Sequence, residues 1–80
     1  MKVIDGVEQF LREYPDWDIM AMYMVNGALI ISAAPSGIDN PEEYLDGFFR
    51  VSTTGIEEYS PVMEREAFNE ALKKPIYVKQ

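Results

Sequence analysis

An uncharged stretch at positions 19–34, IMAMYMVNGALIISAA, constrains the fold more than any other part of the sequence. Asn26 and Gly27 lie between its two apolar halves, and both residues tolerate the positive φ angles of a tight two-residue turn. The pattern therefore predicts a β-hairpin. A two-residue turn also fixes the register, so that Val25 lies opposite Ala28 and Met22 lies opposite Ile31.

Both faces of this hairpin are apolar, which is unusual for a small antiparallel sheet. Side chains point alternately to the two faces of a strand. One face, called the Met face below, carries Met20, Met22, Met24, Leu29, Ile31 and Ala33. The other, called the Tyr face, carries Ile19, Ala21, Tyr23, Val25, Ala28, Ile30, Ser32 and Ala34.

Helical patterns flank the sheet-forming part of the chain. Residues 4–14 have apolar positions at helical spacing, with Asp5 and Glu8 as a capping box and Pro15 as the stop. Residues 60–74 predict a second long helix that Ser60 caps and Pro75 ends, with a buried stripe that includes Met63 and Leu72. A short helix of one or two turns is expected after Asn40.

A second hairpin is expected in FFRVSTTGIEEYS, residues 48–60. Gly55 fits the left-handed position of a three-residue loop, which would place Phe49 beside Tyr59 and Arg50 beside Glu58. A four-residue loop is the alternative and would shift this pairing. Residues 76–78 are expected to add an edge strand.

These elements predict one α+β domain over residues 1–80, in the order α-β-β-(short α)-β-β-α. The sheet is expected to be mostly antiparallel with four to five strands. Both long helices are expected on one face, and the bulkier, purely apolar Met face is the one we expect them to cover.

The composition removes most catalytic chemistry. The chain has no histidine and no cysteine, which excludes Ser-His-Asp and Cys-His catalysis, disulfides and the usual zinc sites. No glycine-rich phosphate loop is present. Capping and solvation explain the acids Asp39, Glu42, Glu43 and Asp46 better than a metal site does. We therefore expect a non-enzyme without cofactor or metal.

The charge balance bears on partners and location. Seven basic and fourteen acidic residues give a net charge of −7, which disfavours nucleic acid and favours a basic partner. The acidic N-terminal residues do not resemble a secretion signal, and the apolar stretch is too short to span a membrane. We expect a soluble, cytoplasmic protein.

Two further features have alternative interpretations. Trp17 is interpreted as closing the end of a small core, although a single tryptophan can also be an interface anchor. Lys73, Lys74 and Lys79 form a basic cluster that helix capping and solubility explain more simply than ligand binding.

An uncovered Tyr face would be an apolar patch of a kind that monomers seldom expose. The sequence therefore predicts a non-catalytic protein-interaction module, with a homodimer as its simplest form because most soluble oligomers are twofold homo-oligomers. The alternative is a small acidic inhibitor of a basic partner. The expected partner-binding residues are Ile19, Ala21, Tyr23, Val25, Ala28, Ile30 and Ser32.

The segment FFRVSTTGIEEYSP resembles the closing hairpin of some small bacterial toxin-immunity proteins, in which an aromatic strand, a Thr-Gly turn and a second strand recur. The resemblance covers 14 of the 80 residues. It implies a small acidic binder that occupies and silences a toxin. It assigns no site residue, because only turn and strand positions match.

Overall fold

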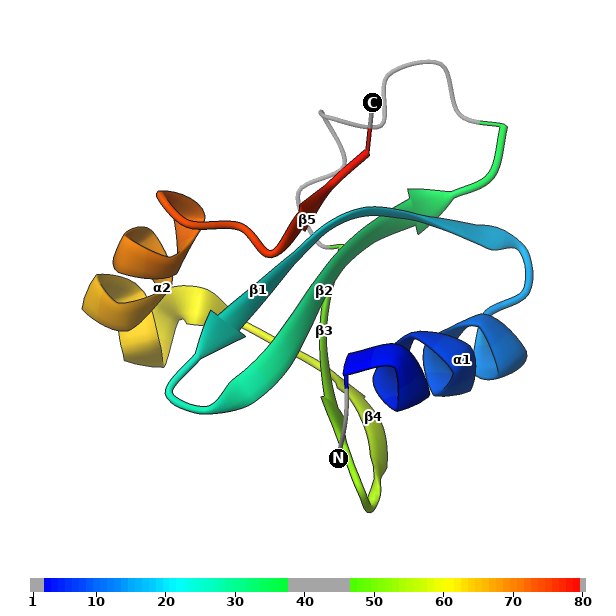
Figure 1. Cartoon of the computed structure of the whole chain (residues 1–80), viewed down its shortest axis with the longest axis horizontal. Coiled ribbons are helices and arrows are strands. Elements are labelled where there is room, and N and C mark those ends of the chain that lie inside the picture. Colours follow the sequence, from blue (N-terminus) through cyan, green and yellow to red (C-terminus); the bar gives the residue numbers. More distant parts are fainter. Residues whose placement is uncertain (1–2, 38–46, 80) are drawn as a thin grey trace.

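The computed structural model describes residues 3–37 and 47–79. Helix α1 (Val3–Glu13) precedes the strands, and the short 3₁₀ helix η2 (Pro61–Glu64) leads into α2 (Arg65–Leu72). The described residues form five strands: β1 (Trp17–Val25), β2 (Ala28–Pro35), β3 (Phe48–Ser52), β4 (Gly55–Glu58) and β5 (Tyr77–Val78). They form one antiparallel sheet in the order β4-β3-β2-β1-β5 (Figure 1). The predicted α+β class is confirmed.

The first hairpin has the register expected from its turn. Val25 pairs with Ala28 and Met22 with Ile31, and the turn residues Asn26 and Gly27 have φ angles of 50° and 80°. The sequence did not predict a bulge at Met20, which interrupts the pairing between Ile19 and Ala21. Because a bulge adds one residue to a strand, every side chain before it changes face.

Helices α1 and α2 lie on opposite faces of the sheet, and the expectation that both long helices would cover one face is wrong (Figure 1). On the Met face, Phe10 of α1 is fully buried against Met22 and Ile31. On the Tyr face, Phe68 of α2 is buried against Val25 and Ile30. Because both faces of the first hairpin are apolar, one helix on each face removes more apolar surface from water than two helices on one face.

The second helix is shorter than predicted. Residues 61–64 form a 3₁₀ turn, and the backbone of Glu64 leaves the helical region at φ −127° and ψ 37° before α2 begins. The Glu64 carboxylate accepts hydrogen bonds from the Asn26 amide and the Tyr59 hydroxyl. Met63 and Leu72, expected in the buried stripe, are both exposed.

The remaining differences concern the second hairpin and the connection before it. Phe49 pairs with Glu58 and Arg50 with Glu57, so the loop has two residues and the predicted pairing is wrong by one position. The Arg50–Glu57 pair is also a salt bridge. The expected edge strand is confirmed as β5, which pairs with β1. The short helix expected after Asn40 lies outside the described residues.

Candidate interaction surface

The residues expected to bind a partner through the Tyr face are largely covered by α2. Ile30 and Val25 are buried beneath Phe68. Tyr23 packs on the same ring, with the two ring centroids 6.1 Å apart, and Ala28 also packs against this cluster. Where α2 lies, this face is the interior of the molecule, and it offers no open apolar surface to a partner.

The other three expected residues do not form a surface together. The bulge at Met20 turns Ile19 to the Met face, where it packs against the core formed with α1. Ala21 is buried, and Ser32, its partner on β2, is partly buried. The sequence pattern could not have placed Ile19 correctly, because it contains no signal for the bulge.

An apolar groove lies on the Met face between α1 and β5. Its volume is about 390 Å³. Two of its residues come from α1, four from β1, and two from β5 and the residue that follows it. These lining residues are Val7, Leu11, Trp17, Asp18, Ile19, Met22, Tyr77 and Lys79.

The groove has a firm aromatic wall. The Trp17 ring meets Phe49 edge-on at a centroid distance of 5.3 Å and Tyr14 at 6.0 Å. Tyr14 in turn lies 5.0 Å from Phe49. Trp17 therefore closes the end of the core, as expected from the sequence, and its ring also lines the groove.

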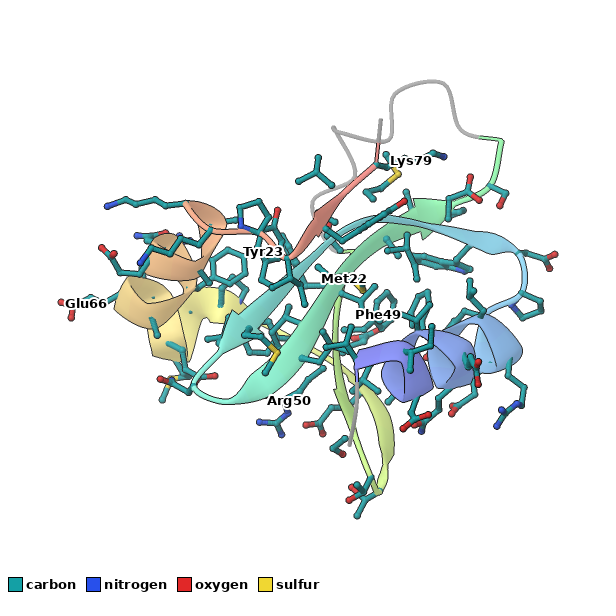
Figure 2. The ribbon with its side chains drawn as sticks, viewed as in Figure 1. Met22, Tyr23, Phe49, Arg50, Glu66 and Lys79 are labelled. Carbon is teal, nitrogen blue, oxygen red and sulfur yellow. The ribbon has the colours of Figure 1, made fainter. Side chains whose placement is uncertain are left out.

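One end of the groove carries an ion pair. The Lys79 ammonium lies 3.8 Å from Asp18 Oδ2, and the Ser36 hydroxyl donates a hydrogen bond of 3.2 Å to Asp18 Oδ1. The Lys79 backbone is held in place because its N–H donates to the Met20 carbonyl at 2.8 Å. Figure 2 labels Lys79 at the end of β5 and Met22 on the neighbouring strand.

Exposed apolar residues continue from the groove onto the edge of the sheet. Leu11, at the rim, is 44% exposed. Ile76, Tyr77 and Val78 of the β5 segment are also exposed. Because Tyr77 pairs with Met22 and Val78 with Ala21, successive β5 side chains point to the Met face and the Tyr face. The apolar surface therefore wraps around this edge.

A second hollow lies near the N-terminal end of α1 and the turn of the first hairpin. Its volume is about 310 Å³, and Val3, Met24 and Leu29 contribute to its lining. No aromatic residue lines it, and its remaining lining residues are Gly27 and Ala28 at the β1–β2 turn, Val51 and Ser52 of β3, and Thr53. The groove beside β5 is the larger of the two and the better candidate for binding a bulky side chain.

Two tyrosine hydroxyls among the described residues have a pKa that their surroundings raise. Burial raises the pKa of the Tyr23 hydroxyl. Burial also raises the pKa of the Tyr59 hydroxyl, and the neighbouring Glu64 carboxylate adds to the effect through its charge and hydrogen bond, while Arg50 opposes it. Within residues 3–37 and 47–79, no three acidic side chains gather as metal ligands would. The acids at 39–46 lie outside these ranges.

The described helices are too short to cross a bilayer. Comparison with models of protein families, with curated proteins and with solved structures finds no match. The candidate surface therefore rests on the chemistry of its own residues.

Proposed function

We propose that this chain is a non-catalytic protein-interaction module that binds its partner through the groove between α1 and β5. The observation that carries the proposal is the apolar lining of this groove, with Trp17 as a fixed wall and Leu11 and Tyr77 exposed at its rim. Tryptophan and tyrosine dominate the energetics of protein interfaces, because each buries a large area while losing few rotamers.

The edge strand strengthens this proposal. Edge strands in soluble proteins are usually protected, because their free backbone groups and apolar side chains can pair with another chain. Here Tyr77 and Val78 of the short strand β5, and Ile76 before them, are exposed beside the groove. A partner that inserts a side chain into the groove can therefore also cover apolar surface along β5.

The interaction surface differs from the one expected from the sequence. A homodimer through the Tyr face requires an open apolar sheet, and α2 occupies that sheet at Tyr23, Val25, Ala28 and Ile30. The groove beside β5 is accessible without any rearrangement of α2. We therefore place the binding surface on the Met face, at its β5 side.

A selection from a random peptide library tests the proposal with a matched pair of variants. Leu11→Lys places a charge at the groove rim. Met63→Lys makes the same change of charge on η2, where Met63 is 91% exposed and outside the groove lining. Both positions are exposed, so both variants are expected to fold.

Peptides enriched on the wild-type chain are expected to lose binding to Leu11→Lys and to keep it on Met63→Lys. The proposal fails if no peptide is enriched, or if the enriched peptides bind both variants as well as they bind the wild type.

A further inference from the structure

We propose that the natural occupant of the groove is a segment of a basic protein, which inserts a large apolar side chain beside Trp17 and places an arginine or lysine on Asp18. This inference rests on the proposed function and names the chemical class of the partner. In the bound state, the partner's cation replaces Lys79 on the Asp18 carboxylate.

The chain itself shows that the groove accepts a basic side chain. Lys79 lines the groove together with apolar residues such as Met22 and Tyr77, and its ammonium faces Asp18. A lysine combines an apolar stem with a charged end, and such side chains cover apolar surface while the charge stays in water. Lys79 therefore occupies the place that a partner's basic side chain would take.

The Lys79–Asp18 pair is weak enough to be exchanged. Its 3.8 Å separation is longer than the 2.7–3.2 Å of a hydrogen bond between nitrogen and oxygen. The two side chains are 45% and 49% exposed, so water screens their attraction. An arginine can bind a carboxylate with two parallel hydrogen bonds, which is a stronger arrangement than the pair it would displace.

The charge around the groove favours a basic partner. The elements that line it, residues 3–25 and 76–79, carry five acidic and two basic residues: Asp5, Glu8, Glu13, Asp16 and Asp18 against Arg12 and Lys79. The whole chain has a net charge of −7. Opposite charge on a partner raises the rate of association and selects against acidic competitors.

The same charge argues against a second copy of this chain as the occupant. Two copies would bring together surfaces of the same sign, because on each copy the elements that line the groove carry more acidic than basic residues. Repulsion between them opposes self-association. The negative charge that repels a second copy attracts a basic partner.

The test uses peptides obtained in the selection described above, synthesised in three forms. The first is the enriched sequence, the second has its Lys and Arg residues replaced by Gln, and the third has its largest apolar residue replaced by Ser. We expect the enriched peptides to be basic, and we expect both replacements to weaken binding at least tenfold, a change of about 1.4 kcal/mol.

Two variants of the protein give opposite results if the inference is correct. Lys79→Gln removes the competing cation and should tighten binding of the basic peptide about threefold, whereas Asp18→Asn should weaken it by at least as much. Glu66→Gln, on the exposed side of α2, changes the net charge in the same way as Asp18→Asn and should leave the affinity within twofold of wild type.

The outcomes separate this inference from the proposed function. Neutral or acidic peptides that are lost on Leu11→Lys would keep the groove as a binding site and overturn the basic partner. Equal affinity of the Gln-substituted peptide, or Lys79→Gln without effect, would also overturn it. A dimer seen by sedimentation and abolished by Leu11→Lys would make a second copy the occupant. Peptides that bind Leu11→Lys as well as wild type overturn both proposals.

Discussion

Phe10 and Phe68 are buried on opposite faces of the β1–β2 hairpin, where each is the largest buried side chain of its helix. Phe10 lies 5.3 Å from Phe49, by ring centroids, and Phe68 lies 5.0 Å from Phe48. Phe48 and Phe49 are neighbours on β3, so their side chains point to the two faces. Phe48 and Phe49 therefore pack into the cores on opposite faces of the sheet. Each face is partly covered by a helix, so neither is entirely open to a partner.

Substitutions on the two faces should consequently have the same effect. Met22→Lys and Ile30→Lys each place a charge at a buried position, one beneath α1 and one beneath α2. Each should cost several kcal/mol from a total stability of about 5–10 kcal/mol, and each should unfold the chain. Circular dichroism with thermal melting measures this.

Met24→Lys is the control for these substitutions, because Met24 is an exposed residue of the same hairpin and should tolerate the charge. If Ile30→Lys kept the wild-type melting temperature, α2 would not cover the Tyr face in solution. A homodimer formed through the Tyr face would then again be the expected form of the protein.

Glu64 should matter more for stability than its partly exposed position suggests. Its carboxylate joins the turn of the first hairpin, through Asn26, to Tyr59, which lies between β4 and η2. Glu64→Ala removes both hydrogen bonds and should cost about 1–2 kcal/mol. In a domain of this size that corresponds to a fall in melting temperature of roughly 4–15 °C.

Glu66→Ala is the matched control, since Glu66 is an exposed acid two residues further along the chain. Its effect should stay within about 0.5 kcal/mol. Equal losses for the two variants would mean that Glu64 does not hold α2 on the sheet.

The tyrosine hydroxyls predict the alkaline limit of stability. Folding raises the pKa of Tyr59 and Tyr23 above the ordinary value of 10.0, so the folded state favours the neutral hydroxyl. The stability that the two neutral hydroxyls contribute to the folded state is fully present below pH 10. It is lost as the pH rises through their raised pKa values. Unfolding by urea between pH 8 and pH 11 should therefore show stability falling in the upper part of this range.

Tyr59→Phe should reduce the slope of that fall, because the variant has one fewer group to ionise. At neutral pH it should also cost up to about 1 kcal/mol through the lost hydrogen bond to Glu64. An unchanged slope between pH 10 and pH 11 would contradict the assignment of the alkaline effect to Tyr59.

Local signals in the sequence predicted the first hairpin and its register, but they did not predict which helix packs on which face of that hairpin. Asn26 and Gly27 specify a turn through backbone angles alone, so the pairing of β1 with β2 follows without knowledge of the tertiary structure. The side on which α2 packs depends on the path of the chain after β4. Residues such as Met63 and Leu72 fit a buried stripe, yet both are exposed.

The candidate surface was harder to predict for a related reason. The groove depends on Ile19 facing α1, and that orientation results from the bulge at Met20. No residue near Met20 is a glycine or proline that would mark a bulge. Trp17 was the one available signal: its alternative interpretation as an interface anchor corresponds to its place in the groove wall.

The chain contains a single tryptophan, and Trp17 lines the groove, so its fluorescence reports directly on the central claim. A selected peptide without tryptophan should shift the emission of Trp17 to shorter wavelength in a saturable titration, because binding removes water from the indole. The same titration should give no shift with Leu11→Lys and the wild-type shift with Met63→Lys. A peptide that binds tightly while the Trp17 emission stays unchanged would place the interaction surface elsewhere on the molecule and contradict the account.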